Sequence, residues 1–181
     1  MTDPDPRTAP PAGHVVLIGM PGVGKSTVGV LLAKATGRDF VDTDVVIQAE
    51  SGQPLAELIQ RRGIEGFCRI EERVVAGLTL ARPSVIATGG SVVYSEPAMG
   101  ILKDGGAVVY LAIDPAVLAE RLADLKARGV VMLPDQSLAS LHAERDALYR
   151  AWADVIVPCD GLNQDGVVAE VCRKLPGGAG C

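Results

Sequence analysis

The chain has 181 residues, 48% of them hydrophobic but only 3% aromatic, so it is long enough for one domain with an aliphatic core. Its net charge of −5 provides no basic face for a nucleic-acid partner, and its apolar runs are too short to cross a bilayer. The four cysteines lack the spacing of a zinc site, and this aliphatic content makes disulfides unnecessary, which predicts free thiols in a reducing compartment.

The first elements follow from composition and periodicity. Residues 1–13 are rich in Pro and Asp without an apolar segment, which predicts a disordered arm rather than a signal peptide, and a cytoplasmic protein. His14–Ile18 is typical of a strand buried on both faces. Lys25–Thr36 has apolar residues at helical spacing, and Gly37 is expected to end this helix. Phe40–Val41 is expected to be a short strand.

The remaining pattern alternates helices with strands. A series of helices is expected from Val45 to about Leu78, with breaks near Gly52 and Gly63. The later elements are strands at Ser84–Ala87, Ala107–Ile113 and Val155–Val157, helices at Pro97–Lys103, from Pro115 to about Leu125, at Leu138–Ala153 and at roughly Asp165–Lys174, and a loop at about 126–137.

Strands separated by helices pair in parallel through right-handed crossovers. We therefore expect a three-layer α/β fold, with a five-stranded parallel sheet covered by helices on both faces. It would form a single domain over 14–175, followed by a frayed C-terminus at 176–181. Ligands of such sheets bind beyond the carboxyl ends of the strands.

A phosphate-binding loop is the strongest signal in the chain. Gly19–Ser26 reads GMPGVGKS, which fits GxxxxGK[ST] at every position and lies between an expected strand and an expected helix. The glycines let backbone N–H groups turn toward a phosphate, the lysine neutralises phosphate charge, and the serine hydroxyl can bind Mg²⁺. The residues expected to bind ATP here are Gly22, Val23, Gly24, Lys25, Ser26 and Thr27.

Two carboxylates follow the second strand, at Asp42 and Asp44, and side chains two residues apart in extended chain share one face. One could hold a metal, and the other could accept a hydrogen bond from a substrate hydroxyl and help to deprotonate it. The alternative is a solvated loop in which Asp44 caps the next helix. Their place after the second strand of a P-loop fold favours the functional interpretation.

These motifs together resemble the shikimate kinase family, from Val15 to Val157. The similar stretches are Gly19–Thr27 (its Walker A run), Asp42–Asp44 (its D-T/S-D motif), Val85–Ser91 (its apolar run before TGGG), Arg121 within LAERL, and Glu144–Tyr149 (its ER-x-PLY). The resemblance implies a P-loop NTPase fold with a lid loop, ATP and Mg²⁺ as cofactors, and a small hydroxylated acceptor.

The same resemblance implies roles for individual residues. Lys25, Asp44 and the lid residue Arg128 are expected to be catalytic, with Asp44 binding the ring hydroxyls of the substrate. Asp42 would contact the magnesium shell together with Ser26. The other implied roles are adenine binding by Arg121, approach to the substrate by Gly89, Gly90 and Ser91, and a grip on the substrate carboxylate by Arg145.

The motifs that the resemblance assigns to substrate binding depart from the family pattern. In the segment that matches G-E-x-x-F-R-x-x-E, Gly63, Phe67 and Glu71 agree, but the family's Glu falls on Ile64. Cys68 occupies the place of the arginine that normally helps to clamp the carboxylate. Arg69 is adjacent, yet one step along a helix turns a side chain by about 100°. Ser91 replaces the third glycine of TGGG, and the lid has no RPLL signature.

The expected function is phosphorylation of shikimate to shikimate 3-phosphate, in aromatic amino-acid biosynthesis. The Cys68 exchange leaves open a related kinase for another small hydroxy acid or polyol. A nucleoside monophosphate kinase would need a second basic nucleotide pocket, and a regulatory module without turnover would lack the catalytic residues. We expect a monomer, and we expect Arg62 and Arg73 to face solvent.

Overall fold

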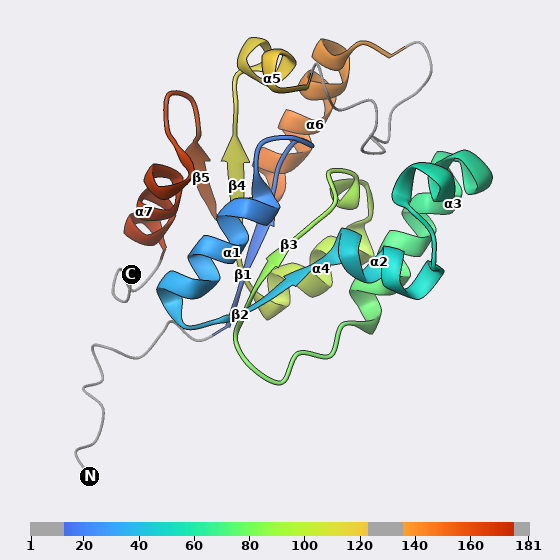
Figure 1. Cartoon of the computed structure of the whole chain (residues 1–181), viewed down its shortest axis with the longest axis horizontal. Coiled ribbons are helices and arrows are strands. Elements are labelled where there is room, and N and C mark those ends of the chain that lie inside the picture. Colours follow the sequence, from blue (N-terminus) through green and yellow to red (C-terminus); the bar gives the residue numbers. More distant parts are fainter. Residues whose placement is uncertain (1–12, 123–135, 176–181) are drawn as a thin grey trace.

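Figure 1 shows the chain as a computed structural model, which describes residues 13–122 and 136–175. The elements are β1 (His14–Ile18), α1 (Lys25–Thr36), β2 (Asp39–Asp42), α2 (Thr43–Ser51), α3 (Leu55–Gly77), β3 (Ser84–Ala87), the 3-10 helix η1 (Val92–Tyr94), α4 (Glu96–Gly105), β4 (Gly106–Ala112), α5 (Pro115–Leu122), α6 (Leu138–Trp152), β5 (Val155–Pro158) and α7 (Gln164–Lys174).

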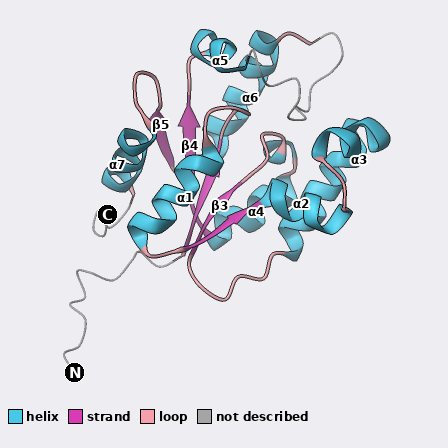
Figure 2. Cartoon of the chain, viewed as in Figure 1, coloured by secondary structure: helices cyan, strands magenta, loops and turns pink. Residues whose placement is uncertain are grey.

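A five-stranded sheet forms the centre of the molecule, as Figure 2 shows in magenta. Its order is β2-β3-β1-β4-β5, and every neighbouring pair is parallel, which confirms the predicted sheet. Helices α1 and α7 pack together on one face, while α4 and α6 pack against β4 on the other. The two helical layers bury four of the five residues of β1, since Val15–Ile18 is at most 1% exposed.

Two glycines determine where α1 ends and how closely it packs. Gly37 adopts a left-handed conformation (φ 63°) and donates its N–H to the carbonyl of Ala33, so the predicted end of the helix is confirmed. Gly29 faces the sheet, where an added Cβ would lie 2.5 Å from the ring of Phe40. Only a glycine lets α1 approach β2 this closely.

Helices α2 and α3 form an arm beside the sheet, at the right of Figure 1. The arm has an apolar cluster of its own, made of Ile47, Leu55, Leu58, Phe67 and Val74. Gly63 breaks α3 with a non-helical conformation (φ 67°, ψ 175°), which divides it into a first segment, 55–62, and a second segment, 64–77. Both predicted breaks are confirmed, because Gly52 ends α2 in a left-handed conformation.

The structure also corrects the sequence analysis. Several elements extend one or two residues beyond their expected ends, and η1 was not predicted. Cys68 and Cys159 are free, but Cys172 is disulfide-bonded, so the prediction of free thiols is wrong for this residue. Disulfide formation requires two Cα atoms within about 7 Å, a proximity that spacing along the chain does not reveal.

Several expectations fall largely outside the described residues. These are the N-terminal arm (1–13), the loop at 126–137 and the C-terminus (176–181). Among the helices that the structure describes, none combines the length and hydropathy needed to cross a membrane.

Candidate active site

The loop between β1 and α1 forms a cradle of backbone N–H groups. Gly19, Gly22 and Gly24 all have positive φ, at 144°, 84° and 106°, which residues with a Cβ rarely adopt. An added Cβ at Gly19 would lie only 2.7 Å from the carbonyl oxygen of Leu111, on β4. The glycines of the motif therefore allow both the turn and its close contact with the sheet.

The N-terminus of α1 opens directly onto this cradle. Gly24 occupies the N-cap position and offers no side-chain acceptor, so the N–H groups of the first turn remain available to an anion. Lys25 Nζ donates to the carbonyls of Gly19 (2.8 Å) and Met20 (3.0 Å). Burial lowers the pKa of Lys25 to about 8, although Asp44 opposes the shift, and the ammonium is still mostly charged at neutral pH.

The two aspartates lie on different elements, since Asp42 ends β2 and Asp44 lies in α2. Asp42 caps α2, since its Oδ1 accepts the N–H groups of Asp44 (3.0 Å) and Val45 (3.4 Å). The alternative interpretation had named Asp44 as the cap, and the structure corrects this because Asp44 lies inside the first turn. Burial raises the pKa of Asp44 to about 6, against the opposing effect of Lys25. A carboxyl group with this pKa can exchange a proton near neutral pH.

The oxygen donors beside the cradle fit a nucleotide-bound Mg²⁺. Within residues 13–122 and 136–175, no three His, Cys, Asp or Glu side chains gather into a metal cage. Mg²⁺ in nucleotide sites needs no cage, because phosphates and waters complete its octahedron around one or two protein oxygens. Ser26 is the second residue of α1 and is exposed, and the cap of α2 uses Oδ1 of Asp42. These two residues would hold the ion.

A buried carboxyl group lies behind the glycines that follow β3. Glu71 is 1% exposed, and its Oε2 accepts the hydroxyl of Ser91 at 2.7 Å. Its Oε1 is buried and has no hydrogen-bond partner in the described structure. Burial raises the pKa of Glu71 to about 7. An added Cβ at Gly89 would collide with Oε1 of Glu71 and lie 3.0 Å from Oδ1 of Asp44, so this glycine brings the two carboxyl groups together.

A buried arginine completes the same region from α6. Arg145 is 1% exposed, its Nε donates to the hydroxyl of Tyr94 at 3.2 Å, and its Cζ lies 5.1 Å from the centre of that ring. A Cβ at Gly90 would lie 3.2 Å from Nη1 of Arg145. The hydroxyl of Tyr149 fixes this turn by donating to the carbonyl of Gly90 at 2.7 Å. Charged side chains of both signs therefore meet beside the cradle. They are Lys25 of α1, Asp42 of β2, Asp44 of α2, Glu71 of α3 and Arg145 of α6.

Comparison with known proteins agrees with this geometry. A family model described as shikimate kinase matches residues 21–176. A shikimate kinase of Mycobacterium avium is 38% identical over 94% of this chain and 97% of its own, and one of Moorella thermoacetica is 36% identical over 90% and 94%. The solved shikimate kinase of Acinetobacter baumannii in complex with shikimate superimposes with a TM-score of 0.83, at 30% identity, covering 91% of this chain and 93% of that one.

This chain belongs to the shikimate kinase family. It is accordingly a phosphotransferase that acts on a hydroxyl group, and its fold is that of the P-loop kinases.

Arg69 does not replace the arginine that the family pattern has at the position of Cys68. Cys68 is half-buried, and its thiol pKa is raised by burial and then by the charge of Glu71, which places it at this site. Arg69 points elsewhere, because its side chain is 74% exposed and forms a 3.8 Å ion pair with Glu65. The region formed by Asp44, Glu71, Arg145 and the turn Gly89–Ser91 is called the acceptor side below. Among the described side chains, Arg145 supplies its guanidinium.

One predicted site residue, Arg121, is not brought into this cluster. Arg121 lies in the last turn of α5 and is exposed. Arg128 lies outside the described residues, so its predicted role remains a prediction.

Sequence reasoning had given no site role to Glu71 or Tyr94. The signal for Glu71 was its spacing of three residues from Cys68, which places both side chains on one face of a helix.

Proposed function

We propose that this chain transfers the γ-phosphoryl group of ATP to a ring hydroxyl of shikimate, giving shikimate 3-phosphate. The observation that carries the proposal is the meeting of Lys25, Asp44 and Arg145 beside a complete phosphate cradle. Family membership supports shikimate as the acceptor. The reaction belongs to the biosynthesis of aromatic amino acids, and we expect a cytoplasmic monomer.

The transfer itself exchanges one P–O bond for another. The acceptor hydroxyl oxygen bonds to the γ-phosphorus while the bond from that phosphorus to the bridging oxygen of ADP breaks. In this proposal Asp44 accepts the hydroxyl proton, and Lys25 stabilises negative charge on the phosphates. Ser26 and Asp42 would hold a Mg²⁺ ion, which would supply positive charge to the phosphates.

The acceptor's carboxylate is assigned to Arg145. Its guanidinium is held by Tyr94 and lies beside Gly90, so it presents a positioned charge-assisted donor to an anionic group. Gly89 keeps this space open, and Ser91 directs its hydroxyl to Glu71 rather than into the site. Lid Arg128 and Arg121 are proposed to contact the phosphates and the adenine.

A second candidate function is phosphorylation of a different small hydroxy acid or polyol. The observation that favours it is Cys68, which leaves one guanidinium where the family pattern supplies two. Loss of one charge-assisted contact weakens binding by about 2–3 kcal/mol, or roughly two decades in affinity. A polyol, having no carboxylate, would not need the second arginine.

A coupled assay of ADP release with Mg-ATP separates the two candidates. Shikimate is compared with a panel of other small hydroxy acids and polyols. We expect shikimate to give the highest kcat/KM. Turnover with another acceptor and none with shikimate would overturn the proposal, and ADP release independent of any acceptor would indicate a module without a transfer function.

The assigned carboxylate contact has its own test. Arg145→Met is expected to raise the KM for shikimate about a hundredfold and to leave the KM for ATP within about twofold. Arg150→Met, on the exposed side of the same helix, is the matched control. Equal effects of the two substitutions would contradict the assignment.

A further inference from the structure

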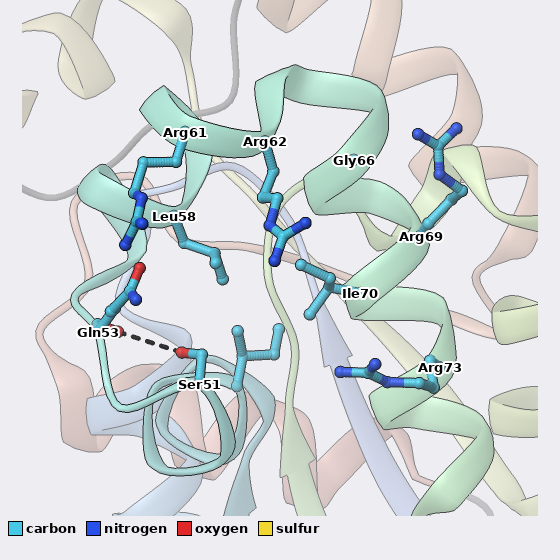
Figure 3. A pocket seen from close by; sticks show the side chains of 10 residues that line it. Ser51, Gln53, Leu58, Arg61, Arg62, Gly66, Arg69, Ile70 and Arg73 are labelled. Atoms are coloured by element: carbon cyan, nitrogen blue, oxygen red, sulfur yellow. Dashed lines mark hydrogen bonds between the residues drawn. The ribbon is translucent and has the colours of Figure 1, made fainter.

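A second pocket opens on the arm, apart from the active site. It has a volume of about 890 Å³ and lies between α2 and the two segments of α3 (Figure 3). None of the residues of the cradle or the acceptor side contributes to it. Its lining consists of Ile47, Ser51, Gln53, Leu58, Arg61, Arg62, Gly66, Arg69, Ile70 and Arg73.

The break in α3 creates this pocket. Because Gly63 leaves the helical conformation, the first segment folds back so that Arg61 and Arg62 face the same hollow as Arg73 of the second segment (Figure 3). Arg69 and Arg73 are four residues apart and share a face of the second segment. Glu71 lies between them and points the opposite way, to the acceptor side.

The charge of the lining is unusual for this chain. Four of its ten residues are arginines and none is acidic, in a chain with 17 basic and 22 acidic residues. Arg69 forms a long ion pair with Glu65 at the rim. In the part of the chain that the structure describes, the guanidinium groups of Arg61, Arg62 and Arg73 make no ion pair or hydrogen bond. Arg62 and Arg73 are exposed, as predicted, but their charges add in one concavity.

One lining residue of the pocket, Gln53, also carries a polar atom without a partner. Oε1 of Gln53 is buried, and no donor reaches it in the described structure. The backbone carbonyl of the same residue accepts the hydroxyl of Ser51 at 3.4 Å, which fixes the loop (Figure 3). A buried amide oxygen without a donor is costly, and a ligand hydroxyl would satisfy it when the Gln53 side chain turns toward the hollow. The walls thus present donors for an anion and one acceptor for a hydroxyl.

We propose that this pocket binds a phosphate monoester of a small hydroxylated compound. The phosphate lies among Arg61, Arg62 and Arg73, and a hydroxyl donates to Gln53. Arginine forks match phosphate oxygens, and a dianion satisfies several unpaired guanidiniums better than a single carboxylate does. The volume suits a small phosphorylated metabolite. Such a ligand would tie the two segments of α3 together across Gly63.

Calorimetric titration of the full chain with D-ribose 5-phosphate tests the site. Saturating Mg-ADP is present throughout, so that the phosphate cradle is occupied. We expect binding with a Kd of about 1 mM or lower, weaker at high salt, and no binding of D-ribose, which lacks the phosphate. The readout needs no turnover, so its failure is distinct from a failure of the proposed function.

Matched variants localise the binding. Arg62→Gln with Arg73→Gln is expected to weaken binding about tenfold or more, through the loss of charge-assisted hydrogen bonds. Arg82→Gln with Arg173→Gln removes the same charge at exposed positions elsewhere and should change the Kd by less than about twofold. The proposal is overturned by absent binding, by equal binding of ribose, or by equal effects of the two double variants.

Discussion

The cradle and the acceptor side are neighbours, but they are constructed differently. The cradle consists mainly of backbone: three glycines with positive φ and an uncapped helix N-terminus within one contiguous segment, Gly19–Ser26. The acceptor side consists of side chains from α2, α3 and α6 and the turn after β3, packed until Glu71 and Arg145 are each 1% exposed. A local conformation defines the first region, and tertiary packing defines the second.

This difference indicates which of the two regions can accept amino-acid substitutions. Backbone N–H groups bind a phosphate whatever the neighbouring side chains are, and the Walker motif is intact. Side-chain recognition can be altered one residue at a time, and Cys68 and Ser91 both lie on the acceptor side. The structure gives Ser91 a use, because its hydroxyl donates to Glu71.

Breaking the cradle should have the largest effect. Lys25→Met removes the charge that faces the phosphates, and we expect kcat/KM to fall about a hundred- to a thousandfold in the ADP-release assay. Lys34→Met, at an exposed position of the same helix, should have almost no effect. A loss confined to the KM of the acceptor would contradict the separation of the two regions.

Asp44→Asn tests the side chain that joins the regions. We expect kcat to fall about a hundredfold, because the amide cannot accept the hydroxyl proton. In the unsubstituted protein, kcat should decline as the pH falls through about 6, where Asp44 takes up a proton. The variant should lack this decline, whereas Asp39→Asn, on the exposed edge of β2, should retain it. Persistence of the acid decline in Asp44→Asn would assign it to another group.

Glu71→Gln tests the cost of burying charge on the acceptor side. The pKa of Glu71 is about 7 in the folded state against an ordinary value of 4.5, so the folded state holds this proton more tightly than the unfolded state. The stability that protonated Glu71 contributes is complete below about pH 4.5 and is lost as the pH rises to about 7. Urea unfolding should therefore find the variant more stable by on the order of 3 kcal/mol at pH 8, with little difference near pH 4.5.

The exposed Glu65→Gln serves as the control for this measurement. A stability difference between Glu71→Gln and the unsubstituted protein that is independent of pH would show that Glu71 does not titrate in this range.

Restoring the family's arginine should have the smallest effect. Cys68→Arg places a guanidinium near Glu71 and across from Arg145, and we expect the KM for shikimate to fall about tenfold through one added charge-assisted bond. The partial repulsion by Arg145 limits the gain. Cys68→Ala should leave KM within about twofold. An unchanged KM in Cys68→Arg would mean that Arg145 alone suffices for the carboxylate.

Much of the fold could be predicted because its signals are local. Apolar runs located β1 and β3 without error, helical periodicity located α1, and Gly52 and Gly63 marked breaks that the structure confirms. The disulfide of Cys172 could not be predicted, since it depends on a distance through space. The cap of α2 was assigned to the wrong aspartate, because Asp42 and Asp44 are equally suitable in composition and only the start of the helix distinguishes them.

The sequence by itself determined the parallel sheet, the phosphate cradle and the residue types around the acceptor, because each depends on periodicity or on a contiguous motif. Only the tertiary structure decided that Ser91 bonds to Glu71, that Arg69 turns away from Cys68, and that the arginines of the arm surround one hollow. The physical reason is that these relations arise from the burial and approach of segments distant along the chain, which no local pattern encodes.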